Sequence, residues 1–353
     1  MQFTTLGKSG LKVSRIGVGC MSYGDRRGRL PWCTEEKDAL PILNAAYEAN
    51  INFYDTANGY SNGTSEEILG KAIKKFNWRR ENIVIATKVW AAVGHIKDGV
   101  FENPMAMKPD ERDNKGYVNA YGLSRKHIFD SVNASLKRLD LEYIDLLQIH
   151  HFDLNTPVKE TMKALHDIVE SGKVRYIGAS SMWAHQLLEM QYEARLHGWT
   201  EFISMQNLHN ATYREEEREM IPALQKFGMG MIPWGPLAQG YLARPHDMFV
   251  ESERGDSMNG KFLGHEWTET DKKINQKIEE IAKNRGTSMA IVSIAWSLSK
   301  PYMTAPIIGM SKIERVEEAI KAIDFKLSDE ELKSIDGLYV PKKVISRLGD
   351  GAP

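Results

Sequence analysis

Short apolar runs alternate with amphipathic helical stretches along almost the whole chain, and this alternation limits the folds that the sequence can adopt. Eight such runs are each followed by at least one stretch with helical periodicity. The predicted strands are Ile16–Cys20, Asn52–Thr56, Ile83–Lys88, Tyr143–His150, Val174–Ala179, Phe202–Gln206, Met229–Trp234 and Thr304–Gly309. The predicted helices are Glu35–Asn50, Ser65–Phe76, Ser124–Leu139, Pro157–Ser171, Ala184–His197, Glu215–Phe227, Glu269–Arg285, Met289–Leu298, Lys312–Ile323 and Ser328–Leu338.

Repeated strand–helix units of this length pair their strands in parallel through right-handed crossovers. A nearly continuous apolar strand such as Ile144–Ile149 is typical of a sheet that is covered on both faces. An open nucleotide-binding sheet would carry G-x-G-x-x-G after its first strand, and the segment Gly17–Gly24 lacks that spacing. The sequence therefore predicts an α/β protein with a closed (β/α)8 barrel.

We expect the 353 residues to form one domain. Residues 1–15 are predicted to form a hairpin with a Ser9-Gly10 turn that closes the bottom of the barrel. Residues 16–323 would form the barrel, and residues 324–353 a further helix and a polar tail. The stretches 89–123 and 235–268 have little periodicity and are interpreted as long loops at the C-terminal face.

The composition indicates a soluble protein without a nucleic-acid or membrane partner, because 46 Lys and Arg nearly cancel 47 Asp and Glu. Two cysteines are too few for a disulfide framework; Cys20 is predicted to be buried, and Cys33 could be a free thiol. Neither a signal peptide nor an apolar run of roughly 20 residues is recognisable, so we expect a cytoplasmic protein.

Ionisable side chains occur at the predicted C-terminal ends of the strands, where barrel enzymes carry their active sites. Asp55 follows the second strand, Lys88 ends the third and His150 ends the fourth, while Tyr60 lies in the loop after Asp55. Lysine rarely ends an apolar strand and needs a counter-charge there, which Asp55 can supply. A tyrosine beside the ammonium would have its pKa lowered from about 10 and could act as a general acid.

Each of these residues also fits a structural role when it is considered alone. Asp55 could cap a turn, Tyr60 could be a half-buried loop aromatic, and the neighbouring His151 could replace His150. The occurrence of all four on consecutive strand ends favours a catalytic group, in which His150 would hold the carbonyl oxygen of a substrate.

The segments Asp55–Tyr60, Ile85–Lys88 and Asp145–His150 resemble the signatures of aldo-keto reductases, in order and at similar spacing. The resemblance runs from about Phe3 to Ile323 and is greatest to the fungal aryl-alcohol-dehydrogenase-like branch, which is related to the potassium-channel β subunits. It implies NADPH-dependent reduction of aldehydes and ketones, with Tyr60 as acid, Lys88 and Asp55 tuning it, and His150 orienting the carbonyl.

The resemblance also implies the nucleotide site. Ser180, Ser181 and Gln206 would hold the nicotinamide carboxamide, Trp234 would stack on the ring, and Lys312 and Arg315 suit a 2′-phosphate. The full implied set is Gly19, Cys20, Met21, Asp55, Ser180, Ser181, Gln206, Trp234, Gly235, Pro236, Leu237, Gln239, Gly240, Gly309, Ser311, Lys312, Arg315 and Glu318. The chain departs from the family by having Ser181 and Ala319 where asparagine is frequent.

The substrate is expected to be a small aryl or medium-sized carbonyl compound, because aromatic residues fall in or beside the long loops. The candidate wall comprises Tyr23, Trp32, Trp90, His150 and His151, with Tyr117 and Tyr121 nearby. We expect a monomer or weak homo-oligomer. The alternative function is a redox-sensing, nucleotide-binding regulatory subunit with little turnover; a metal-dependent barrel enzyme is disfavoured by the lack of a metal-spaced cluster.

Overall fold

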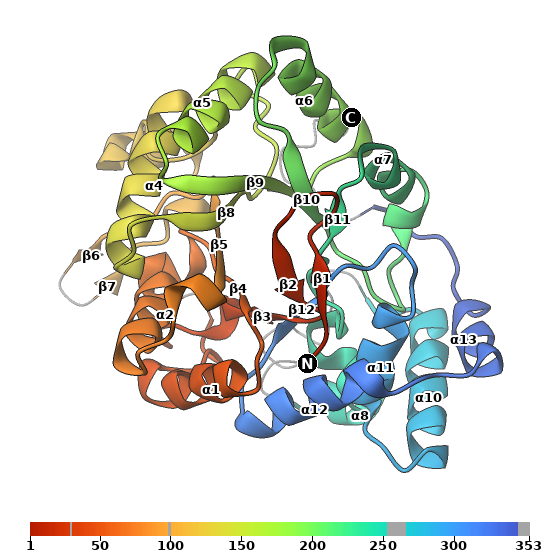
Figure 1. Ribbon diagram of the computed structural model, residues 1–353. Coiled ribbons are helices and arrows are strands. Elements are labelled where there is room, and N and C mark those ends of the chain that lie inside the picture. The colour runs from red at the N-terminus through yellow and green to blue at the C-terminus, as the bar shows by residue number, and fades with distance from the viewer. Residues whose placement is uncertain (29, 98–99, 253–265, 345–353) are drawn as a thin grey trace.

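The computed structural model describes residues 1–28, 30–97, 100–252 and 266–344. At its centre is an eight-stranded parallel sheet with the order β11-β10-β9-β8-β5-β4-β3-β12, curled into a ring inside the helices (Figure 1). Its strands are β3 (Gly17–Gly19), β4 (Phe53–Asp55), β5 (Val84–Val89), β8 (Ile144–Ile149), β9 (Val174–Ser180), β10 (Phe202–Gln206), β11 (Gly230–Met231) and β12 (Ile307–Gly309). The predicted (β/α)8 barrel is confirmed.

The ring is completed between the two ends of this sheet by single backbone contacts instead of a regular ladder. Met231 forms an isolated bridge with Met303, and Trp234 forms one with Ile307. The Ile307 N–H donates to the carbonyl of Pro233, with an N to O distance of 2.9 Å. Pro233 has no N–H to return, which explains why the predicted strand Met229–Trp234 is reduced to the two residues of β11.

The helices lie around the outside of the barrel, close to their predicted positions. They are α1 (Glu36–Glu48), α2 (Thr64–Lys75), α4 (Arg125–Leu139), α5 (Val158–Glu170), α6 (Ala184–His197), α7 (Met220–Phe227), α10 (Glu269–Asn284), α11 (Met289–Leu298), α12 (Ile313–Asp324) and α13 (Asp329–Asp336). Ser124 caps α4 by accepting from the His127 N–H, and Ser328 forms a capping box with Glu331 at α13. The predicted helix Glu215–Phe227 is instead a 3-10 turn, Glu215–Glu217, followed by α7.

The N-terminal hairpin consists of β1 (Phe3–Thr5) and β2 (Lys12–Ser14) and lies across the barrel axis in Figure 1. Leu6 and Val13 join the apolar side chains at the lower end of the barrel interior. Gly7 has φ +60°, and a Cβ there would lie 2.6 Å from the Gly228 carbonyl oxygen, so this close approach requires glycine. The hairpin therefore closes the bottom of the barrel, as predicted.

The two long connections contain more regular structure than we predicted. The stretch after β5 contains the hairpin of β6 (Ile96–Lys97) and β7 (Val100–Phe101), the short helix α3 (Pro109–Arg112) and a π-helical turn, Asp113–Tyr117. The described part of 235–268 contains a 3-10 turn, Ala238–Ala243, and α8 (His246–Val250). Residues 253–265 of this loop and the predicted tail from 345 onward lie outside the described residues.

Both cysteines are buried and free of disulfide bonds, so Cys20 is buried as predicted and Cys33 is the free thiol that the sequence suggested, although it too is buried. Burial raises the pKa of the Cys33 thiol to about 11. Among the described helices, none is sufficiently long and apolar to cross a membrane.

Candidate active site

The upper half of the barrel interior is polar because alternate residues of each strand point inward. Phe53, Val84 and Leu146 belong to the apolar cluster inside the barrel, and the residues two or four positions further along are Asp55, Lys88 and Gln148. All three polar residues are buried. The C-terminal ends of β4, β5 and β8 thus bring charged and amide groups together over an apolar base.

Lys88 is the centre of this group. Its Nζ donates to Asp55 Oδ2 (2.5 Å), to the Thr56 carbonyl (3.0 Å) and to the Tyr60 hydroxyl (3.3 Å). The three donor positions of the ammonium are therefore occupied, and the buried charge is paired as its burial requires. This is the arrangement in which Lys88 and Asp55 can act on Tyr60.

Two glutamines hold the other oxygen of Asp55. Gln148 Nε2 donates to Asp55 Oδ1 at 2.8 Å, and Gln206 Nε2 donates to the same atom at 2.9 Å. Gln148 is not among the site residues predicted from the sequence. Its position two residues before His150 on the same face of β8 was the signal that could have identified it.

Burial raises the pKa of the Tyr60 hydroxyl above its ordinary value, and the Lys88 charge lowers it by less. The prediction that this pKa falls is therefore wrong: loss of hydration disfavours the phenolate more than the ammonium favours it. Burial acts to lower the pKa of Lys88, but Asp55 and Tyr60 outweigh it and hold the pKa above its ordinary value. At neutral pH the pair is a protonated phenol beside an ammonium.

His150 faces Tyr60 across the rim. Their ring centroids are 5.5 Å apart with an interplanar angle of 81°. Burial, together with His151 and Lys88, holds the pKa of His150 well below its ordinary value. The imidazole is therefore neutral at physiological pH and can donate one hydrogen bond without carrying charge.

The candidate substrate residues are placed in different surroundings. His151 stacks on His150 at 5.0 Å, and Trp90 meets His151 edge-on at 5.2 Å, so these three rings continue from Tyr60. Tyr23 is fully buried and donates to the Met310 carbonyl (2.7 Å), so it packs the rim and presents no surface to a substrate. Trp32 lies with Ser311 and Lys312 along a groove of about 560 Å³, which groups it with nucleotide candidates.

The remaining loop aromatics, Tyr117 and Tyr121, hold the connection after β5 together. Tyr117 is buried, donates to Glu102 Oε2 (2.6 Å) and accepts from the His95 N–H (3.0 Å). The Arg112 guanidinium lies 4.2 Å from the centroid of the Tyr121 ring. Both tyrosines therefore have a packing role in this structure.

The carboxamide candidates meet at the ends of β9 and β10. The Ser180 hydroxyl donates to the Gln206 carbonyl (2.7 Å), and the Ser181 N–H donates to Asn207 Oδ1 (2.7 Å). The Trp234 N–H donates to the backbone carbonyl of Asn207 at 3.1 Å. Asn207, which is not among the site residues predicted from the sequence, thus connects three segments of the candidate site.

The loop after β11 and the start of α12 supply the other nucleotide candidates. Ala238, Gln239 and Gly240 have successive positive φ values of 46°, 59° and 101°, which turns their backbone sharply beside Leu237. The remaining members of the predicted set lie at the end of β3, in this loop and around the start of α12: Gly19, Cys20, Met21, Gly235, Pro236, Gly309, Ser311, Lys312, Arg315 and Glu318. Ala319 is fully buried in the main core, so the position has no side chain at the surface of α12.

Arg244 is a further candidate that was not predicted from the sequence. Burial and the nearby positive charge of Arg315 both lower the pKa of Arg244. Arg315 is itself paired with Glu318 Oε2 at 2.5 Å. Two guanidinium groups that repel one another can together bind an anion. Arg244 and Arg315 are far apart in the sequence, so no motif indicates that they meet.

Within the part of the chain that the structure describes, no group of three His, Cys, Asp or Glu side chains is arranged to hold a metal ion. A closed parallel barrel with a buried lysine–aspartate pair beside a tyrosine at its C-terminal rim defines a class of α/β-barrel enzyme that can transfer a proton at that rim.

Comparison with known proteins identifies the family within this class. The model of the aldo/keto reductase family matches residues 15–340. The chain is 47% identical over 338 residues to a putative aryl-alcohol dehydrogenase of Schizosaccharomyces pombe, covering 95% of each chain. It is 46% identical over 346 residues to the versiconal hemiacetal acetate reductase of Aspergillus parasiticus (98% of each), and 42% identical over 339 residues to a putative aryl-alcohol dehydrogenase of Saccharomyces cerevisiae (96% of this chain, 97% of that one).

The chain belongs to the aldo-keto reductase family. It is an oxidoreductase that acts on carbonyl compounds with a nicotinamide cofactor, and the resemblance noted in the sequence is confirmed.

Proposed function

We propose that this protein reduces aldehydes and ketones to alcohols with NADPH, and that Tyr60 is the general acid. The observation that carries the proposal is the chain of contacts from Asp55 through Lys88 to the Tyr60 hydroxyl, at 2.5 and 3.3 Å, on the rim of the barrel. NADPH would supply the hydride, and the protein must then supply a proton to the carbonyl oxygen.

The residues of the rim are suited to that proton transfer. Tyr60 keeps its proton at neutral pH because burial raises its pKa. When the proton leaves for an alkoxide, the phenolate that remains lies beside the Lys88 ammonium, which stabilises it. Neutral His150, across from Tyr60, can hold the same substrate oxygen by a hydrogen bond.

The preference for NADPH over NADH rests on cations around the start of α12. Arg244 and Arg315 repel one another, and Lys312 lies at the exposed N-terminal end of the helix. A 2′-phosphate would relieve this repulsion and would also accept hydrogen bonds from the helix terminus. We assign the carboxamide end of the nucleotide to Ser180, Ser181 and Gln206, and ring stacking to Trp234.

We propose aryl or medium-sized carbonyl compounds as substrates, because Tyr60, His150, His151 and Trp90 form a continuous row of rings. The names of its relatives, among them aryl-alcohol dehydrogenases and a hemiacetal acetate reductase, agree with this size class. We further propose a cytoplasmic protein that acts as a single-domain monomer or weak homo-oligomer.

The test is reduction of 4-nitrobenzaldehyde with NADPH by the wild type and by Tyr60→Phe. We expect kcat to fall by a factor of about 10² to 10⁴ in the variant, the usual contribution of a general acid, with the Kd for NADPH nearly unchanged. Unchanged turnover in Tyr60→Phe would exclude this mechanism. Tight nucleotide binding by the wild type without turnover of any carbonyl would support the regulatory alternative instead.

A further inference from the structure

Three consecutive glutamates, Glu215, Glu216 and Glu217, form the 3-10 turn between β10 and α7. Glu215 and Glu216 are buried, and the side chain of Glu217 is 27% exposed. Adjacent carboxylates that lose most of their water are costly unless each has its own donors. The hydrogen-bond partners of these three glutamates show which parts of the chain the turn joins.

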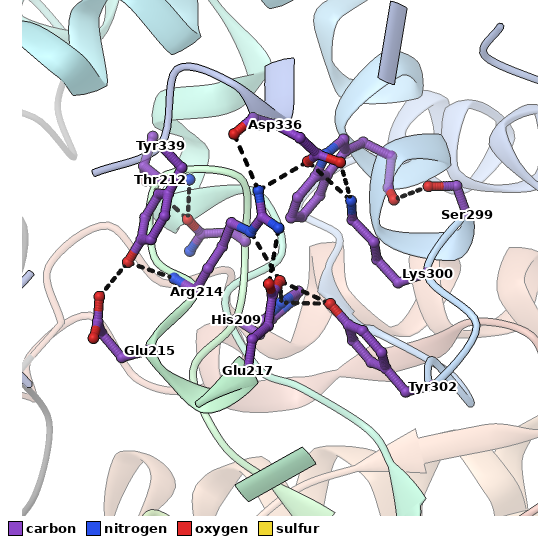
Figure 2. A network of polar contacts seen from close by, with 12 residues as sticks. His209, Thr212, Arg214, Glu215, Glu217, Ser299, Lys300, Tyr302, Asp336 and Tyr339 are labelled. Atoms are coloured by element: carbon purple, nitrogen blue, oxygen red, sulfur yellow. Dashed lines mark hydrogen bonds and ion pairs between the residues drawn. The ribbon is translucent and has the colours of Figure 1, made fainter. Parts of the chain in front are cut away.

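The first and third glutamates attach the turn to distant parts of the chain (Figure 2). Glu215 Oε1 accepts from the Tyr339 hydroxyl (2.5 Å) and from the Lys342 N–H (2.7 Å), both in the segment after α13. Glu217 Oε1 accepts from the Tyr302 hydroxyl (2.8 Å), which precedes β12. The turn is therefore anchored on both sides and has little freedom to move.

The middle glutamate points to the candidate nicotinamide site. Glu216 Oε2 accepts from Asn207 Nδ2 at 2.5 Å. The other end of the Asn207 amide accepts from the Ser181 N–H at 2.7 Å, and its backbone carbonyl accepts from the Trp234 N–H at 3.1 Å. Asn207 is fully buried, so these contacts are not exchanged with water.

The orientation of the Asn207 amide decides what Ser181 does. Ser181 has φ +51°, a left-handed conformation that is unfavourable for a residue with a Cβ and must be held by its surroundings. The hydrogen bond to Asn207 Oδ1 holds it, provided that the Asn207 NH₂ group points away from Ser181. Glu216 enforces that orientation together with the Met182 carbonyl, which accepts from Asn207 Nδ2 at the longer distance of 3.2 Å, because a carboxylate and a carbonyl accept hydrogen bonds and cannot donate them.

We infer that Glu216 is a positioning residue for the nicotinamide end of the nucleotide, acting through Asn207 on Ser181 and Trp234. This inference rests on the proposed function. The contacts of the turn with the C-terminal segment hold Glu216 in place, and Glu216 in turn orients Asn207, which contacts Ser181 and Trp234.

The first test compares two ligands that share the adenosine end: NADPH, and adenosine 2′,5′-bisphosphate, which lacks the nicotinamide. In Glu216→Ala the Kd for NADPH should rise about tenfold, the value of one charge-assisted hydrogen bond, while the Kd for the bisphosphate stays within about twofold. Glu219→Ala removes an exposed glutamate from the same region and should change neither. Equal weakening of both ligands, or of neither, would overturn the inference.

The second test reverses the hydrogen bond. Asn207→Asp places two carboxylates opposite one another, and should weaken NADPH binding more than Glu216→Ala does. Adding Glu216→Gln lets the new amide donate to the new carboxylate, so the double variant should bind NADPH several-fold more tightly than the single Asn207→Asp. No recovery in the double variant would overturn the relay. If thermal melting shows that Glu216→Ala does not fold, the comparison of the double variant with Asn207→Asp still tests the inference.

The outcomes separate this inference from the function on which it rests. If the wild type fails to bind NADPH, the proposed function is wrong and the inference falls with it. If the wild type binds and reduces 4-nitrobenzaldehyde with NADPH while Glu216→Ala binds NADPH equally well, only the positioning role is wrong.

Discussion

Lys88 holds an ammonium inside the barrel, where loss of hydration disfavours the charged form, and three acceptors compensate for that loss. Asp55 is held in turn by Gln148 and Gln206, so the carboxylate is fixed before any substrate arrives. Tyr60 is the least constrained member, at 3.3 Å from the ammonium. The Lys88–Asp55 pair is therefore preorganised, whereas the Tyr60 side chain keeps more freedom to adjust to a substrate.

At the scale of this residue, the raised pKa of Tyr60 predicts the pH dependence of reduction. Tyr60 is the proton donor, so the reductive kcat should stay level through neutral pH and fall only above the ordinary tyrosine value of about 10. The measurement is kcat for 4-nitrobenzaldehyde at saturating NADPH between pH 6 and roughly 11. A decline beginning below about pH 8 would mean that Lys88 outweighs burial and lowers this pKa.

Among the elements, the connection between β5 and α4 lies beside the rim. It begins at Trp90, whose ring meets His151, and it returns to Trp90 at Gly122, whose N–H donates to the Trp90 carbonyl at 2.8 Å. Its two halves are held together by Tyr117, which joins Glu102 to the His95 N–H. Asn62, in the turn after Tyr60, also contacts this connection by donating to the Glu102 carbonyl (2.8 Å). The acid and the loop beside it are thus linked.

At this scale, Tyr117→Phe should raise the KM for the aldehyde by about three- to tenfold, since loss of one hydrogen bond to a charged group loosens the wall beside Trp90. The kcat and the Kd for NADPH should change little, because the Lys88–Asp55 pair and the candidate nucleotide-binding residues lie on other elements. Steady-state kinetics measure the difference, with Tyr192→Phe on α6 as a control for an exposed hydroxyl. An unchanged KM would show that this connection does not contact the substrate.

Across the whole molecule, the C-terminal helix α13 is held to the barrel by a network of charges (Figure 2), in addition to the fully buried side chain of Ile335. Asp336 at the end of α13 accepts from Arg214 (3.0 Å), Lys300 (2.6 Å) and Trp296 Nε1 (2.8 Å). Burial raises the pKa of Glu217, but hydrogen bonds from His209 and Arg214 outweigh it and hold the pKa below its ordinary value. Stability from this carboxylate is therefore present above its unfolded pKa and is lost as the pH falls below it.

At this scale, Asp336→Ala should lower the free energy of unfolding by about 1–3 kcal/mol, because Arg214 and Lys300 lose a shared acceptor and Asp336 is only partly exposed. Urea denaturation followed by tryptophan fluorescence measures it, and a single transition is expected for one domain. Asp324→Ala, which removes one exposed hydrogen bond to Gln2, is the control and should cost less than about 0.5 kcal/mol. Equal stability of the two variants would contradict a structural role for the network.

Much of the architecture follows from local patterns that survive folding unchanged. The alternation of apolar and amphipathic segments predicted every strand of the barrel, and Ser124 and Ser328 marked the starts of α4 and α13. The boundaries failed where backbone chemistry intervened, as at Pro233, and where polar side chains shaped a loop, as Tyr117 does. The site roles of Gln148 and Asn207 were not predicted, because neither glutamine nor asparagine indicates a function by residue type alone.

The sequence alone determined the class of fold and the identity of the candidate catalytic residues, because strand ends in a parallel barrel must meet at one rim. It also limited the chemistry, since a lysine at the end of an apolar strand needs a charged partner. Only the tertiary structure decided the sign of the Tyr60 pKa shift, the removal of Tyr23 from the substrate wall, and the link from Glu216 to Ser181. Those properties depend on burial and on contacts between residues far apart in the chain, and no local pattern encodes either.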